Sequence, residues 1–188
     1  MLIASLNPGK ARELSRLALH WGLSPVAASE VSLEAPEESG TSFLENAELK
    51  ARAAASHCEM PALADDSGLI IEAQPRIAGV HTARWAQALG GYDAAFARLL
   101  GAEATEAQCA IYVCALCYAL PDGEVWLGEG RVTGCVVYPA RCAGPGVWPY
   151  FVPAGADRSL AELDEAELER AHPRWRAGAA LRDPRRPF

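Results

Sequence analysis

The chain has 188 residues, six cysteines and a formal net charge of -7 at pH 7. This length is about that of one large domain, so we expect residues 1–188 to form a single domain. The acidic balance argues against a broad binding surface for nucleic acid or for an anionic membrane. No apolar run approaches the roughly 20 residues of a spanning helix, and no basic segment with a long apolar stretch opens the chain. We therefore expect a soluble, cytoplasmic protein.

The cysteines raise the question of a metal site or of disulfides. Cys114 and Cys117 have the spacing of a zinc half-site, but they lie in residues 110–120, whose composition predicts a strand. Residues three apart on a strand face opposite sides of the sheet, and no second pair at ligand spacing completes the site. We expect these cysteines to pack in the core as small apolar side chains.

The amino terminus has the pattern of a strand that turns into a helix. Residues 1–6 suit a short strand, Asn7 is a favourable helix cap, and Pro8 suits the first helical position. Backbone N–H groups at a helix start bind anions, and Lys10 adds a positive charge. The segment is either a phosphate site or an ordinary turn with a solvated lysine, because it lacks the full spacing of a P-loop.

Residues 22–41 are predicted to hold a second strand and a loop, and a second helix should follow them. Ser42 and Glu45 have the spacing of a capping box, so this helix should begin at Ser42 and extend to about Cys58.

Four polar residues of this region are candidates for a site. Asn46 and Lys50 lie one helical turn apart and therefore share a face. Glu37 and Glu38 precede the helix in the loop, where they are either solvated charges or metal ligands.

The central motif of the sequence is the adjacent pair Asp65 and Asp66. The apolar residues 61–64 predict a buried strand, and Ser67 and Gly68 favour a break in the backbone after the carboxylates. Mg²⁺ takes oxygen ligands and is usually held by one or two carboxylates plus substrate phosphates. We expect this motif to form half of a phosphate-processing site.

The second half of the chain completes a mixed α/β pattern. Its expected elements are a loop at 74–83, a short helix capped by Asp93, a hairpin of strands 110–120 and 124–128, a strand near 132–138, and a helix at 164–171. The loop 142–155 is rich in glycine, proline and aromatic residues, so it forms either a nucleobase pocket or a cover on the core. Most arginines of the tail should be solvated: Arg174, Arg176, Arg182, Arg185 and Arg186.

Several motifs together resemble the inosine triphosphate pyrophosphatase family, the non-canonical purine NTP pyrophosphatases. They are Asn7-Pro-Gly-Lys10-x-Arg-Glu13, Glu37-Glu-Ser-Gly40-x-Ser-Phe-x-Glu-Asn-Ala47-x-x-Lys50-Ala51, Ala64-Asp-Asp-Ser-Gly-Leu69, and Gly79-Val-x-Thr-Ala-Arg84-Trp85. The match covers the whole chain in order and is most specific over residues 1–100. The resemblance implies an elongated α/β fold with a mixed central β-sheet flanked by helices, a homodimer, and Mg²⁺-dependent hydrolysis of a nucleoside triphosphate to monophosphate and pyrophosphate.

The resemblance also implies roles for individual residues. Asp66 would activate water and bind metal together with Glu37 and Asp65, although Glu38 competes with Glu37, and Lys10 and Lys50 would supply positive charge in catalysis. The substrate would be bound by Ser5, Asn7, Gly9, Lys10, Asn46, Ser67, His172 and Arg174. Trp148 stands where the family has another residue, and its ring is our candidate for contact with the base.

The carboxyl half departs from the family pattern. Where the family has Gly-Phe-Gly-Tyr-Asp-Pro, this chain has Gly144-Pro-Gly-Val-Trp-Pro149, so a stacking ring and a base-reading carboxylate are replaced. The family lysine aligns with Leu168, and the family's later Ser-His-Arg aligns without gaps with residues 172–174. A shift of the alignment by one residue would instead place His172 on the family histidine.

The sequence leaves three hypotheses of function open, of which the third is a structural protein that uses this fold and neither binds nor hydrolyses a nucleotide. The first is a pyrophosphatase that keeps the phosphate chemistry and has altered base selection, with inosine and xanthosine triphosphates as the first substrates to try and a modified nucleotide as the alternative. The second is a catalytically weak protein that binds or senses a nucleotide.

Overall fold

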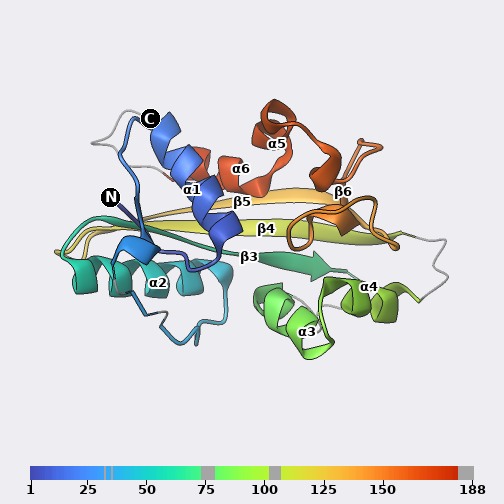
Figure 1. Ribbon diagram of the computed structural model, residues 1–188, viewed down its shortest axis with the longest axis horizontal. Coiled ribbons are helices and arrows are strands. Elements are labelled where there is room, and N and C mark those ends of the chain that lie inside the picture. The colour runs from blue at the N-terminus through green and yellow to red at the C-terminus, as the bar shows by residue number, and fades with distance from the viewer. Residues whose placement is uncertain (32, 35, 73–78, 102–106, 182–188) are drawn as a thin grey trace. The chain divides into compact units, whose positions relative to one another are not determined.

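The computed structural model describes the chain except residues 32, 35, 73–78, 102–106 and 182–188 (Figure 1). The chain divides into two compact units. The first unit consists of Met1–Asp66, Cys114–Gly130 and Arg174–Phe188, and the second consists of Ser67–Val113 and Arg131–Pro173. Among the described residues, no helix is long and apolar enough to cross a bilayer.

Within the described residues, six strands form one sheet in the order β2-β1-β3-β4-β5-β6. They are β1 (Leu2–Ile3), β2 (Val26–Ala27), β3 (Ala62–Ile71), β4 (Gln108–Ala119), β5 (Val125–Val136) and β6 (Phe151–Pro153). β1 pairs in parallel with β2 and β3, whereas β5 and β6 are antiparallel. The predicted mixed sheet of an α/β fold flanked by helices is therefore confirmed.

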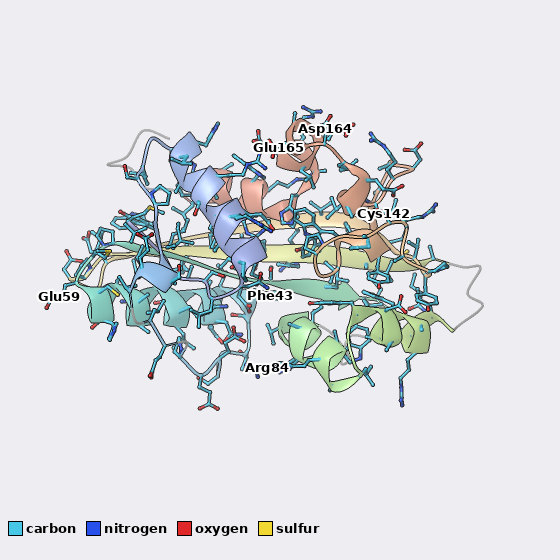
Figure 2. All side chains as sticks on the ribbon, in the orientation of Figure 1. Phe43, Glu59, Arg84, Cys142, Asp164 and Glu165 are labelled. Atoms are coloured by element: carbon cyan, nitrogen blue, oxygen red, sulfur yellow. The ribbon has the colours of Figure 1, made fainter. Side chains whose placement is uncertain are left out.

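In the first unit, α1 (Pro8–His20) and α6 (Pro173–Ala180) cover one face of the strands, and α2 (Phe43–Cys58) covers the other (Figure 1). Phe43 and Glu59 mark the two ends of α2 in Figure 2. Both predicted caps are confirmed, since Asn7 accepts from the first turn of α1 and Ser42 accepts from Glu45 N–H. The core includes Leu14, Leu17, Leu63, Leu116 and Ala177.

In the second unit, α3 (Thr82–Ala88) and α4 (Tyr92–Leu100) lie on one side of the strands and α5 (Glu165–Ala171) on the other (Figure 1). Asp164 and Glu165 stand at the start of α5 in Figure 2. Short 3₁₀ turns complete the fold: η1 (Ala28–Glu30), η2 (Gly79–His81), η3 (Trp148–Tyr150) and η4 (Leu160–Glu162). Stacked rings in this unit, such as Phe96 on Tyr150 with centroids 4.5 Å apart, form much of its core.

Two predicted breaks in strands are absent. β3 runs through Asp65, Asp66 and Gly68 without interruption, because buried neighbours hold both carboxylates within a regular strand. The two strands predicted at 124–128 and 132–138 are one strand, β5. Its Gly128 suits this place because α6 comes close to it: an added Cβ would lie 2.3 Å from Ala177 O.

Three further expectations need correction. Gly91, not Asp93, precedes α4, and Asp93 instead accepts hydrogen bonds from the hydroxyls of Tyr138 and Tyr150. Part of the expected loop forms η2 and α3, while residues 74–78 lie outside the described residues. The tail forms α6, and Arg174 is buried rather than solvated because two carboxylates neutralise it. Arg182, Arg185 and Arg186 also lie outside the described residues.

Candidate active site

The amino end of α1 holds the predicted phosphate-binding segment in the first unit. Asn7 Oδ1 accepts from the N–H groups of Gly9 (2.9 Å) and Lys10 (3.3 Å), so it uses two of the donors expected to face a phosphate. A phosphate that used these donors would displace the Asn7 side chain. Ser5 precedes the turn, and its hydroxyl lies 3.5 Å from Asn7 O.

The adjacent carboxylates of β3 point to opposite faces of the strand. Successive side chains on a strand alternate between the two faces of the sheet. Asp65 contacts Lys10 of α1 (3.3 Å) and Arg174 of α6 (2.7 Å), whereas Asp66 contacts Asn46 and Lys50 of α2. The two carboxylates therefore have different partners and cannot act as one paired ligand from one face.

Asp65 is the centre of a buried ionic cluster. Its Oδ2 accepts from Arg174 Nη2, and Arg174 Nη1 donates to Glu13 on α1. Burial acts to raise the pKa of Asp65, but Lys10, Arg174 and Lys50 outweigh it and hold this pKa well below its usual range. Asp65 is therefore ionised in the folded protein, and it anchors Lys10 and Arg174.

Asp66 lies in a different environment on the side of α2. Asn46 Nδ2 donates to Asp66 Oδ2 (3.2 Å), and Asn46 Oδ1 accepts from Gly40 N–H (2.8 Å). This pair of bonds fixes the orientation of the buried Asn46 amide. Gly40 is needed for the approach, because a Cβ there would lie 2.6 Å from Asn46 Oδ1. The loop before α2 is thus tied to Asp66 through one amide.

Lys50 connects Asp66 to the same loop. Its Nζ lies 2.9 Å from Glu38 Oε1 and 3.3 Å from Asp66 Oδ1. Burial acts to lower the pKa of Lys50, but Asp66, Asp65 and Glu38 together raise it, so the ammonium remains charged. Burial raises the pKa of Asp66 even though Lys50 and Lys10 act to lower it. A carboxylate with a raised pKa is better suited to accept a proton near neutral pH than an ordinary one.

The structure distinguishes the two glutamates of the loop. Glu38 is half-buried and bonded to Lys50, whereas Glu37 is exposed. Among the described residues, no group of three or more histidine, cysteine, aspartate or glutamate side chains is arranged to hold a metal ion. Mg²⁺ typically needs only one or two carboxylates because phosphates and water supply its other ligands. Asp66 and Glu38 meet at a single cation, the Lys50 ammonium, so this donor set suits that mode of binding.

The remaining predicted substrate residues belong to the second unit. Ser67 is half-buried on β3. Trp148 in η3 is half-buried against the core, and its ring centroid lies 5.1 Å from that of His172. His172 is buried and also meets Tyr112 edge-on at 5.1 Å. Trp148 and His172 thus lie together in the second unit.

The role of Glu13 was missed from the sequence. It stands three residues after Lys10 on α1 and therefore on the same side of the helix, a spacing that could have indicated a shared partner. Burial raises the pKa of Glu13, and the guanidinium of Arg174 opposes that effect. The partner, Arg174, is 161 residues away in the chain, so local spacing could not show which residue it is.

Comparison with known proteins identifies the family. The model of the Ham1 family matches residues 1–184, and the chain belongs to this family. It is 40% identical over 174 residues to a dITP/XTP pyrophosphatase of Rhodopseudomonas palustris, covering 89% of this chain and 83% of that protein. It is 41% identical over 185 residues to a dITP/XTP pyrophosphatase of Gluconobacter oxydans, covering 96% and 88%.

Solved structures agree with this assignment. A HAM1 protein from Coxiella burnetii superposes with a TM-score of 0.77 at 30% identity, covering 96% of this chain and 94% of that chain. A nucleoside-triphosphatase, also called dITP/XTP pyrophosphatase, from Mycobacterium abscessus has a TM-score of 0.69 at 36% identity, with 90% of each chain covered. The resemblance recognised in the sequence is thereby confirmed.

Proposed function

We propose that this protein hydrolyses a nucleoside triphosphate to the monophosphate and pyrophosphate, with Asp66 as general base and Mg²⁺ as cofactor. The observation that carries the proposal is the setting of Asp66, a buried carboxylate with a raised pKa held between Asn46 and the charged Lys50. Membership of the Ham1 family and relatives named dITP/XTP pyrophosphatase support the reaction class.

In this mechanism, Asp66 positions a water molecule and accepts its proton as the water oxygen attacks a phosphorus of the anhydride between the α- and β-phosphates. The bridging P–O bond breaks, and the monophosphate and pyrophosphate separate. Asn46 holds the Asp66 carboxylate in place, so the base needs little reorganisation. Lys50 and Lys10 place positive charge where negative charge develops on the phosphates. Asp65 acts through Lys10, whose ammonium it positions.

Asp66 and one carboxylate of the pair Glu37 and Glu38 would hold Mg²⁺. We favour Glu38 for this role, because it is half-buried and both it and Asp66 form an ion pair with Lys50. Bound Mg²⁺ would neutralise charge on the phosphate oxygens. Asp65 is less suited to be a ligand, because it points to the opposite face of β3 from Asp66 and contacts Lys10 and Arg174 there.

Base selection is proposed to differ from that of the relatives. Trp148 and His172 stand where the family has a base-reading carboxylate and the serine or histidine, and their rings lie 5.1 Å apart. Aromatic stacking tolerates every base, whereas hydrogen bonds to the base discriminate among bases. Inosine, deoxyinosine and xanthosine triphosphates are the first candidates, and a modified nucleotide is the alternative.

A substrate screen tests the proposal. A panel of nucleoside triphosphates is incubated with the protein and Mg²⁺, and monophosphate, pyrophosphate and orthophosphate are measured separately. Monophosphate and pyrophosphate in equal amounts are expected, with no turnover by Asp66→Asn. Orthophosphate and a nucleoside diphosphate as first products would refute the bond assignment, and binding without turnover would favour the weakly catalytic alternative.

We also propose the homodimer that the family resemblance implies, and a cytoplasmic location remains a prediction. Sedimentation of the protein over a range of concentrations would test the dimer directly, since a monomer at every concentration would refute it.

A further inference from the structure

Two of the cysteines lie opposite each other on neighbouring strands of the second unit. The hairpin between β4 and β5 closes with a hydrogen bond from Leu120 N–H to Glu124 O of 2.9 Å, which sets these residues opposite each other. β4 and β5 both contain 12 residues and begin and end at matching distances from this turn. Pairing outward from the hairpin without an inserted residue therefore sets Cys109 opposite Cys135.

The hydrogen bonds of the flanking strands fix the kind of pair. Opposite residues in an antiparallel ladder alternate between hydrogen-bonded and non-hydrogen-bonded pairs. Leu120 and Glu124 belong to the first kind, so alternation assigns Cys109 and Cys135 to the second. In agreement, Cys109 O accepts from Glu72 N–H (3.2 Å), and Cys135 is paired with Val152 of β6. Non-hydrogen-bonded pairs have Cα atoms about 4.5 Å apart, within the roughly 4.4–6.8 Å that a disulfide spans.

Both cysteines also face the same side of the sheet. Ala110 and Tyr112 of β4 and Val132 of β5 belong to one core cluster, so the odd-numbered neighbours on each strand face the other side. Cys109 is exposed, Cys135 is half-buried, and both are free thiols. Burial and the nearness of Cys109 raise the pKa of Cys135, which agrees with their close placement.

The other cysteines of the same strand differ in accessibility. Cys114 and Cys117 are buried, and burial raises the pKa of each to about 12. A thiol must ionise and be reached by the oxidant before it reacts. Cys109 is therefore the residue of β4 that an oxidant in solution reaches first.

We infer that Cys109 and Cys135 are a redox-modification site that forms a reversible disulfide with a disulfide oxidant such as oxidised glutathione. The Cys109 thiolate attacks one sulfur of the oxidant and releases one glutathione thiolate. The Cys135 thiolate then attacks the Cys109 sulfur of this mixed disulfide and releases the second. The two cysteines lose two protons and two electrons, and the oxidant is reduced to two thiols.

Formation of this bond would tie β4 to β5 within the unit that holds Trp148 and His172. Exposed disulfides are readily reduced by thiols and are the labile or regulatory ones. The site would therefore respond to the thiol–disulfide balance around the protein, without using any residue placed in the phosphate chemistry.

Peptide mapping of the full-length protein tests the inference. The reduced protein is incubated with oxidised glutathione, the remaining thiols are alkylated, and the protein is cleaved with trypsin. Cleavage after Arg131 and Arg141 releases Cys135 on residues 132–141, where it is the lone cysteine of the peptide. We expect this peptide to be linked to residues 99–131, and dithiothreitol to abolish the link.

Single variants identify the partner and serve as controls. Cys109→Ser should lose the link and carry glutathione on Cys135, whereas Cys142→Ser, changed in the loop after β5 (Figure 2), should keep the link. Persistence of the link in Cys109→Ser would overturn the inference, because Cys114 or Cys117 would then be the partner. Separate glutathione adducts on Cys109 and Cys135, links between molecules, or no oxidation of the wild type would also overturn it.

Discussion

Asp65→Asn and Asp66→Asn should have opposite effects on stability although the residues are adjacent. Asp65 has its pKa lowered in the fold, so its ionised form stabilises the protein above its ordinary pKa of 3.8, and this contribution is lost as the pH falls. Asp66 has its pKa raised, so its charge opposes folding at neutral pH. We expect Asp65→Asn to destabilise the fold and Asp66→Asn to leave stability unchanged or higher while abolishing turnover.

The magnitude for Asp65 follows from its burial. Asp65 and Arg174 are both 2% exposed, and Asp65→Asn would remove one of the two carboxylates that pair with the guanidinium, leaving its ion pair with Glu13. Removing one partner of a buried ion pair costs about 3–5 kcal/mol. With a urea dependence of about 1–3 kcal/mol per molar, the unfolding midpoint of Asp65→Asn should fall by about 1 M or more at pH 7.

Urea unfolding followed by circular dichroism measures both variants side by side. The control is Arg174→Met, because Asp65→Asn should destabilise that background much less than the wild type. Residues in one ionic network couple by about 0.5–3 kcal/mol. Equal midpoints for the two aspartate variants, or a less stable Asp66→Asn, would show that the assignment of the two charges is wrong.

Four further results are expected. Glu38→Gln should raise the Mg²⁺ concentration needed for half-maximal turnover more than Glu37→Gln does, because Glu38 lies at Lys50; the reverse order in a Mg²⁺ titration would assign the metal to Glu37. In Gly40→Ala, the added Cβ would lie 2.6 Å from Asn46 Oδ1 and would displace the Asn46 side chain. Because this side chain orients the proposed base, kcat should fall by about tenfold or more. An unchanged kcat would remove Asn46 from the mechanism. Burial and Asp93 raise the pKa of Tyr150 to about 12, so the stability of the protein should fall as the pH rises from 10 towards 12. The fall should be smaller in Tyr150→Phe. Urea midpoints that change with pH in the same way for both proteins would contradict this. Trp148→Ala should raise KM by about tenfold if the ring stacks on the base, whereas a lower melting temperature with unchanged KM and substrate ranking would show that Trp148 only fills the core.

Local patterns predicted the elements whose causes are local. Asn7 and Ser42 cap their helices, and Pro121-Asp-Gly123 closes the hairpin, because each acts on residues within one turn. The break expected after Asp66 is absent because burial on both sides of β3 decides its conformation. The burial of Arg174 on α6 was missed because its partners Asp65 and Glu13 are far away in the chain.

The candidate site shows the same limit. The sequence predicted Asp66, Lys50 and Asn46 in one region, since Asn46 and Lys50 share a face of α2. The separation of Asp65 from Asp66 could have been predicted from strand periodicity, but the expected backbone break concealed it. Only the packing of α1 and α6 shows that Asp65 is an anchor.

The departures from the family pattern and the charged residues proposed for the phosphate chemistry fall in different units of the fold. Lys10, Lys50, Asp66 and Arg174 belong to the first unit, and the altered residues 144–149, Leu168 and His172 belong to the second. Each unit has its own core cluster, and Trp148 and Leu168 pack against the cluster of the second. Substitutions there can be absorbed by repacking of that cluster, whereas a change at Arg174 would remove the guanidinium that donates to the buried Asp65. The proposed change in base selection therefore concerns residues of the second unit, whereas the residues proposed for the phosphate chemistry belong to the first.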